Sequence, residues 1–245
     1  MMKTIGLIGG MSWESTATYY SRLNEEVRRR RGVLASAEIL LRSVDFSRIV
    51  AIQKRGAWDE AADEMIGLAR SLERGGADMV LICTNTMHKL ADAVEAAISV
   101  PLLHIADAVS VAVKAGGFRR PLLLATQYTM EQDFYLDRMR QRHGLSALVP
   151  ASAEDRRLVH SVIFDELCQG IVREESRAAF QAVMEKGKKA GADCVILGCT
   201  EIGLLISQQD TDLPVFDSTV LHADAALDLA MAEAPKVARQ PAMAA

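Results

Sequence analysis

Short apolar runs alternate along the chain with longer segments in which apolar residues recur at helical spacing. One such segment, residues 57–74, places its apolar positions on one helical face and ends at Gly75 and Gly76. Strands that are apolar throughout and separated by helices are typical of a parallel sheet covered on both faces, so the pattern predicts an α/β fold. The predicted strands are residues 3–8, 37–44, 78–82, 101–103, 121–125, 145–148, 193–197 and 214–216.

A weak internal repeat divides the chain into two similar halves. Residues 76–84 match residues 191–200 when one residue is inserted, which sets Cys83 and Cys199 in equivalent places. Parallel sheets in general reuse such strand and turn chemistry, which is the alternative explanation of the match. We predict a first domain formed by residues 1–104 and 214–232, a second formed by residues 105–213, and a flexible tail over residues 233–245.

The composition is that of an ordinary soluble protein. Half of the 245 residues are hydrophobic and 24% are charged, and 28 Lys and Arg residues against 32 Asp and Glu residues give a net charge of −4. This balance argues against nucleic-acid binding, because it supplies no long-range attraction to a phosphate backbone. No apolar run has the length of a membrane span, and the first residues predict a strand rather than a signal peptide. Because the four cysteines form no disulfide framework, we expect a cytoplasmic protein.

Two of these cysteines stand where reactive thiols are found. Cys83 and Cys199 each follow an apolar strand directly and precede a helical segment. Ligands of parallel sheets bind at the carboxyl ends of the strands, and a helix N-terminus lowers the pKa of a thiol. Cys194, inside a predicted strand, and Cys168, on a predicted helix, are interpreted as core cysteines. Two thiols that face each other across one cleft would supply the opposed acid and base groups that a racemisation needs.

The residues after these two cysteines suit the same chemistry. Thr84, Asn85 and Thr86 follow the first cysteine, and Thr200 and Glu201 follow the second. Hydroxyls, an amide and free backbone N–H groups at a helix start can hold a carboxylate and stabilise the charge of a carbanion. Threonine and asparagine are also common helix caps, which is the alternative interpretation of each residue.

Spacing argues against a nucleotide cofactor or a metal. The glycine turn at residues 6–14 lacks the Gly-x-Gly-x-x-Gly pattern, and Asp45 follows Gly10 by 35 residues rather than by about 20. We expect these glycines to let the backbone approach a small ligand, and Ser12 to cap a helix or contact that ligand. No pair of cysteine or histidine residues has the two-residue spacing typical of zinc ligands, so we expect no metal.

With these motifs assembled, the chain resembles the aspartate/glutamate racemase family, the amino-acid racemases that need no pyridoxal phosphate. The resemblance lies in residues 5–16, 43–46, 83–88, 125–130 and 198–202. It implies two Rossmann-like (flavodoxin-like) domains with parallel sheets, related by a pseudo-twofold axis. It also implies a homodimer, no cofactor, and a cleft that holds one amino acid between two cysteines.

Carried over by position, Cys83 and Cys199 would be the acid/base pair. The residues expected to hold the α-carboxylate and amino group are Thr84, Asn85, Thr86 and Thr200. Those expected to line the pocket are Met11, Ser12, Gln53 and Thr126.

This chain departs from the glutamate racemases that support cell-wall synthesis. Those proteins have an Asp-Ser-Gly opening and a histidine where this chain has residues 9–12 and Glu201, so the chain looks closer to the aspartate branch. An acidic substrate would need a cation, for which Arg48 is the candidate. Residues 155–165, where some relatives place a lysine in the pocket, contain Arg156 and Arg157 instead, which puts a strict preference for aspartate in doubt.

The sequence thus predicts a cofactor-independent racemase that acts at the α-carbon of an amino acid. The expected substrate is aspartate or glutamate. Alternatives with the same architecture are a broad-specificity amino-acid racemase, a hydantoin racemase, a malonate decarboxylase, and a maleate isomerase that would use one cysteine as a nucleophile. The alternative from another class is a non-catalytic protein that binds an amino acid.

Overall fold

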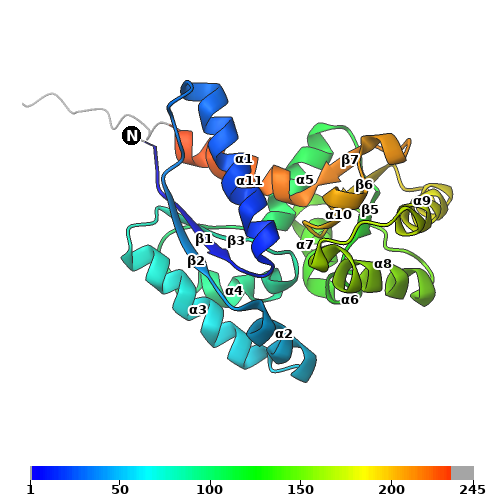
Figure 1. Cartoon of the computed structure of the whole chain (residues 1–245), viewed down its shortest axis with the longest axis horizontal. Coiled ribbons are helices and arrows are strands. Elements are labelled where there is room, and N and C mark those ends of the chain that lie inside the picture. The colour runs from blue at the N-terminus through cyan, green and yellow to red at the C-terminus, as the bar shows by residue number, and fades with distance from the viewer. Residues whose placement is uncertain (1, 233–245) are drawn as a thin grey trace, which may run out of the picture.

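The computed structural model describes residues 2–232 and contains two parallel sheets, one in each half of the chain (Figure 1). The first has the order β2-β1-β3-β4, formed by Ile39–Ser43, Ile5–Gly9, Met79–Ile82 and Leu102–Leu103. The second has the order β5-β6-β7, formed by Pro121–Leu124, Cys194–Leu197 and Val215–Asp217. All named strand pairs are parallel, so the predicted α/β class with parallel sheets is confirmed.

Helices cover both faces of the first sheet, because alternate residues of its central strands point to opposite sides. Ile5, Leu7, Met79 and Leu81 pack against α1 (Trp13–Arg31) and α11 (Ser218–Met231), which lie side by side in Figure 1. The intervening residues face the other way, toward the helices α2, α3 and α4 and the short 3-10 helix η1. These span Phe46–Arg55, Trp58–Arg74, Ala91–Glu95 and Thr86–Leu90.

The second sheet is enclosed in the same manner by a separate apolar core. Fully buried Tyr135 and Phe180 belong to it, from α7 and α9 respectively. The α-helices of this half are α5, α6, α7, α8, α9 and α10, which span Ile105–Ala115, Gln127–Glu131, Asp133–His143, Ala153–Asp165, Glu174–Lys189 and Ile202–Leu205. Two short 3-10 helices, η2 and η3, span Leu167–Gln169 and Gln208–Asp210.

Two strand predictions need correction. Residues 145–148 form a single bridge between Leu148 and Leu122, because Pro150 lacks the N–H that a longer ladder would need. The strand predicted at 214–216 is β7, and it pairs with β6 of the second sheet, whereas we assigned it to the first domain. The chain returns to the first sheet only after Asp217, through α11. The other domain boundaries stay predictions, and the predicted tail lies outside the described residues.

The expectation that the glycines of this turn let the backbone approach a ligand stays a prediction. The packing of two turns already requires Gly10. Its φ of 88° is left-handed, and a Cβ there would collide with the backbone of Val44, which follows β2. Its N–H is 2.8 Å from Thr16 Oγ1, which accepts the hydrogen bond.

Replacing Gly10 by alanine is therefore expected to lower the free energy of unfolding by about 2 kcal/mol, measured by urea denaturation. The matched control is Gly67→Ala on the exposed side of α3, where a Cβ meets nothing within 4 Å. That change is expected to raise stability by about 0.5–1 kcal/mol. Equal stability of the two variants would contradict the packing argument.

Among residues 2–232, no helix combines the length and the apolar character that crossing a bilayer demands.

Candidate active site

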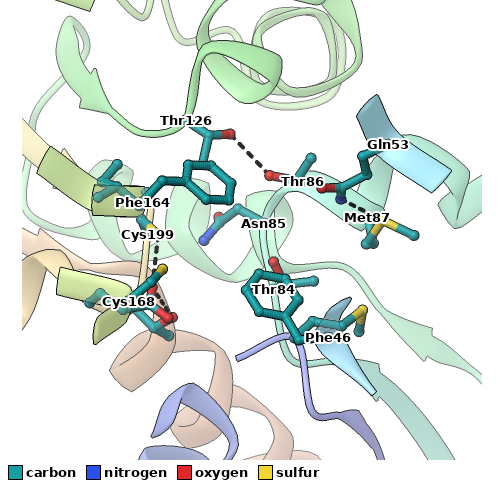
Figure 2. A pocket seen from close by; sticks show the side chains of 15 residues that line it. Phe46, Gln53, Thr84, Asn85, Thr86, Met87, Thr126, Phe164, Cys168 and Cys199 are labelled. Atoms are coloured by element: carbon teal, nitrogen blue, oxygen red, sulfur yellow. Dashed lines mark hydrogen bonds between the residues drawn. The ribbon is translucent and has the colours of Figure 1, made fainter. Parts of the chain in front are cut away.

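A pocket lies between the two halves, at the carboxyl ends of their central strands (Figure 2). Its wall comes from the turn after β1, from α2, from the segments after β3 and β6, from the start of α6, and from α8 with η2. The lining residues are Met11, Phe46, Gln53, Thr84, Asn85, Thr86, Met87, Thr126, Ile163, Phe164, Cys168, Gly198, Cys199, Thr200 and Glu201.

Most of the predicted site residues meet here. The predicted residues that line the pocket are Met11, Gln53, Thr84, Asn85, Thr86, Thr126, Cys199, Thr200 and Glu201. Ser12 lies just behind the wall, where it caps α1 and donates a hydrogen bond to Glu201. The individual roles we assigned to these residues stay predictions.

Cys83 is the main exception. Its side chain is fully buried and continues the alternation of Met79 and Leu81, so it belongs to the apolar cluster beneath α1 and α11 and not to the pocket wall. Burial alone raises the pKa of this thiol well above its usual range. The expectation that Cys83 faces Cys199 across the cleft is therefore corrected: the pocket wall begins one residue after Cys83, at Thr84.

The register of the two halves explains the correction. The N–H of Cys83 donates to Ile8 O at 2.9 Å, and the N–H of Gly198 donates to Leu124 O at 2.7 Å, so these two residues occupy equivalent places at the ends of their strands. Thr84 is then the counterpart of Cys199, and the repeat matches without an inserted residue. Close packing explains the glycine at position 198, because a Cβ there would lie 2.6 Å from Leu123 Cδ1.

A buried carboxylate joins the two halves beside the Cys199 thiol. Glu201 is 4% exposed and accepts hydrogen bonds from Cys199 Sγ at 2.8 Å and from Thr200 Oγ1 at 2.9 Å. Ser12 of the first half donates to its other oxygen. Within residues 2–232, no arginine or lysine pairs with this carboxylate. Its three neutral donors compensate for burial, and its charge acts directly on the thiol.

The pKa of Cys199 is raised well above its usual range, first by burial and then by the charges of Glu201 and Cys168. The thiol is thus protonated at rest, with its proton directed at a carboxylate oxygen. Deprotonation of Cys199 can therefore proceed by transfer of that proton to Glu201.

Replacing Glu201 by glutamine is expected to lower the pKa of Cys199, because the neighbouring negative charge is removed. The midpoint of Cys199 alkylation by iodoacetamide, followed by peptide mass spectrometry, should move to lower pH by about one unit. Cys83 and Cys194 are fully buried and report unfolding within the same sample. A midpoint that stays in place or rises would contradict a charge effect of Glu201.

Polar groups of the pocket are oriented from both halves. Asn85 Nδ2 donates to Ser218 Oγ at 3.0 Å, while Asn85 Oδ1 is buried without a partner. The hydroxyl of Thr86 lies 3.0 Å from that of Thr126 and 3.2 Å from that of Thr129. Asn85, a lining residue, thus has a buried carbonyl oxygen whose capacity to accept a hydrogen bond is unused.

Arg48 lies outside the pocket. Its side chain is 63% exposed and forms an ion pair with Glu64. In α2, Ile49, Ile52 and Gln53 share the buried face, and Arg48 lies off that face. The structure therefore does not bring our candidate cation to the site.

Sequence reasoning missed the apolar part of the wall. Cys168, which we interpreted as a core cysteine, is partly exposed in η2 and lines the pocket, and burial raises its pKa to about 12. The other lining residues that we did not predict are Phe46, Met87, Ile163, Phe164 and Gly198. Helical periodicity marks such residues only as buried, so it does not separate a pocket wall from a core.

The histidines without an assigned role form a buried neutral group behind the site. His88 Nδ1 lies 2.8 Å from Thr84 O, and His222 Nδ1 lies 2.7 Å from the Tyr19 hydroxyl. His104 caps α5 through its Nδ1. Burial lowers the pKa of His88 to about 4 and that of His222 to about 3. No group of three metal-ligating side chains occurs in the described part of the chain.

The two halves form an α/β protein whose strand ends meet at a pocket with a thiol, hydroxyls and a buried carboxylate, the place where ligands bind in such folds. A sequence model of the Asp/Glu/Hydantoin racemase family matches residues 8–226. The chain belongs to this family and is an enzyme of the racemase (isomerase) class, which confirms the resemblance described above.

Individual relatives agree with this assignment. The broad specificity amino-acid racemase RacX of Bacillus subtilis (strain 168) is 22% identical over 227 residues, which are 89% of this chain and 94% of RacX. A provisionally assigned Asp/Glu racemase from Yersinia pestis is 48% identical, with a TM-score of 0.88 over 94% of this chain and 100% of that one. An aspartate racemase homologue from Pyrococcus horikoshii OT3 is 33% identical, with a TM-score of 0.81 over 94% and 99% of the two chains.

Proposed function

We propose that this protein racemises a free amino acid at its α-carbon without a cofactor, and that Cys199 and Thr84 act on opposite faces of that carbon. The observation that carries the proposal is the placement of these two residues at equivalent strand ends of the two halves, on the same pocket (Figure 2). It replaces the pair of cysteines that the sequence led us to expect.

The proton steps use groups of the chain. Glu201 accepts the proton of Cys199 through their existing hydrogen bond, and the thiolate then removes the α-proton of one enantiomer. The C–H bond breaks, an S–H bond forms, and the electron pair stays on the α-carbon and its carboxylate. The Thr84 hydroxyl delivers a proton to the opposite face. The proton held by Glu201 then passes through solvent to the Thr84 oxygen, which returns both groups to their starting state, while Cys199 keeps the proton taken from the substrate. The reverse reaction runs through the same steps in the opposite order.

Neighbouring groups support a bound amino acid. Asn85 Oδ1 accepts a hydrogen bond from the α-ammonium group, and the hydroxyl of Thr86 donates to the α-carboxylate. Donors that face this carboxylate also stabilise the negative charge that spreads onto it when the α-proton leaves.

The test is proton NMR in D₂O on L- and D-amino acids supplied separately, with chiral chromatography of the products and no added cofactor. Loss of the α-proton signal together with appearance of the other enantiomer is the expected result. If the folded, reduced protein exchanges the α-proton of no amino acid, the proposal is wrong.

A second candidate is favoured by the absence of the Cys83 thiol from the pocket wall, because an isomerisation with one nucleophilic cysteine needs only Cys199. A maleate isomerase of this kind would form a covalent adduct at Cys199. Mass spectrometry of the protein after incubation with maleate separates this candidate from racemisation.

The proposal also includes the cytoplasm as the location and a homodimer as the assembly. Analytical ultracentrifugation at several concentrations tests the dimer: a single species at the monomer mass would contradict it.

A further inference from the structure

One part of the pocket wall is apolar, and it is the part that would face the side chain of a bound amino acid. Phe46 and Met87 contribute to it from the first half, and Ile163 and Phe164 from the second. Figure 2 shows the rings of Phe46 and Phe164 reaching the pocket from α2 and α8. The polar groups that fit the α-carboxylate and the ammonium group come from other segments, after β3 and β6.

The charge of the wall is negative. Among the lining residues, Glu201 is the one with a carboxylate, and none is an arginine or a lysine. Lys89, near the pocket through η1, donates to Gln132 and stacks over Trp58, with its nitrogen 4.1 Å from the ring centroid. Arg48 is paired with Glu64 on the surface.

The side-chain carboxylate of aspartate or glutamate would therefore enter this pocket without a counter-ion and next to the buried carboxylate of Glu201. An ionised group that loses its water without a cationic partner is strongly disfavoured, whereas an apolar side chain gains from contact with the rings. From this arrangement, which rests on the proposed racemase function, we propose that the enzyme selects amino acids with uncharged, largely apolar side chains over aspartate and glutamate.

An outer hollow next to this wall contains a further cation, Lys54. It is lined by Val50, Gln53, Lys54, Tyr128, His160, Ser161, Phe164 and Asp165, and it shares Gln53 and Phe164 with the pocket. Phe164 is held in that place by His160, whose ring centroid lies 4.8 Å from its own. Lys54 is exposed and shares the hollow with the carboxylate of Asp165, so its charge is hydrated and has an acidic neighbour there.

The experiment compares kcat/KM for α-proton exchange of L-methionine and L-norleucine with that of L-aspartate and L-glutamate. The neutral substrates are expected to exceed the acidic ones by about 100-fold or more. Exchange that is as fast with glutamate as with methionine would overturn the inference and leave the proposed function standing. Exchange with no amino acid would overturn the proposed function itself, and the inference with it.

A charge placed in the wall tests the physical cause. Phe164→Lys is expected to raise the ratio of kcat/KM for glutamate over methionine by at least 10-fold, because it supplies the missing counter-ion. Phe164→Met, which has a similar unbranched stem and no charge, is the matched control and should leave that ratio within about threefold of the wild type. If both variants change the ratio equally, the apolar wall acts by shape and the charge argument is wrong.

The variant Lys54→Met tests whether Lys54 binds the side chain of an acidic substrate in the outer hollow. The inference expects the ratio to stay unchanged in this variant. A specific loss of activity toward glutamate would show that acidic side chains reach the outer hollow, which would overturn the inference.

Discussion

Replacing Cys199 by alanine is expected to lower kcat for racemisation in both directions by about 10³-fold, because the group that exchanges a proton with one face of the α-carbon is removed. Cys199 lines the pocket and donates its proton to Glu201, and the alanine variant has no acid or base at that position. Chiral chromatography of timed reactions measures the loss, and KM is expected to change little.

Cys83→Ala is the matched control for this result. It removes the thiol that belongs to the apolar cluster beneath α1 and α11, so activity should stay within about threefold of the wild type. Its free energy of unfolding should fall by about 1 kcal/mol, because a small cavity is left in a packed core. An inactive, fully folded Cys83→Ala protein would restore the two-cysteine mechanism and contradict the assignment of Thr84.

Replacing Thr84 by valine is expected to lower the rate at which the enantiomers interconvert by 10²-fold or more. Exchange of the α-proton on the face next to Cys199 should continue. Valine keeps the shape of threonine and lacks its hydroxyl. One enantiomer should therefore incorporate deuterium from D₂O without inversion, a product that NMR combined with chiral separation identifies. The enantiomer whose α-proton faces Thr84 should exchange far more slowly.

Thr84→Ser retains the hydroxyl and is the control for this variant. It is expected to interconvert the enantiomers within about tenfold of the wild-type rate. Wild-type inversion by Thr84→Val would show that another group, or water, serves the second face. Equal loss of exchange from both enantiomers would show that Thr84 binds the substrate and does not transfer the proton.

The sequence predicted the fold because the residues that decide it are local and periodic. The helix expected over 57–74 spans Trp58–Arg74, and seven of the eight expected strands are present. The polar residues after β3 and β6 were found for a topological reason: parallel strands bring their carboxyl ends to one edge, wherever they lie in the chain. Thr86 and Thr126 meet across that edge although 40 residues separate them.

Cys83 and Arg48, which the sequence analysis placed in the site, were misplaced for identifiable reasons. The inserted residue that aligned Cys83 with Cys199 moved the register by one position, and in a strand one position reverses the face. The alternation of Met79, Leu81 and Cys83 was visible in the sequence and would have corrected the pair. The helical periodicity of α2 likewise places Arg48 off the buried face that Ile49 and Gln53 share, which would have excluded Arg48 from the pocket. Phe46 and Phe164 carry no comparable signal, because an aromatic residue on a helix faces a core and a pocket equally well.

The position of α11 has a consequence for synthesis on the ribosome. Its residues Ala223, Ala226 and Leu227 cover the face of the first sheet that carries Ile5 and Leu7, yet the whole second half is translated before them. The emerging first half therefore shows an incompletely covered apolar face while the second half is made. That surface invites chaperone binding or aggregation until α11 docks, so we expect closure of the first sheet to be a late event in the maturation of the protein.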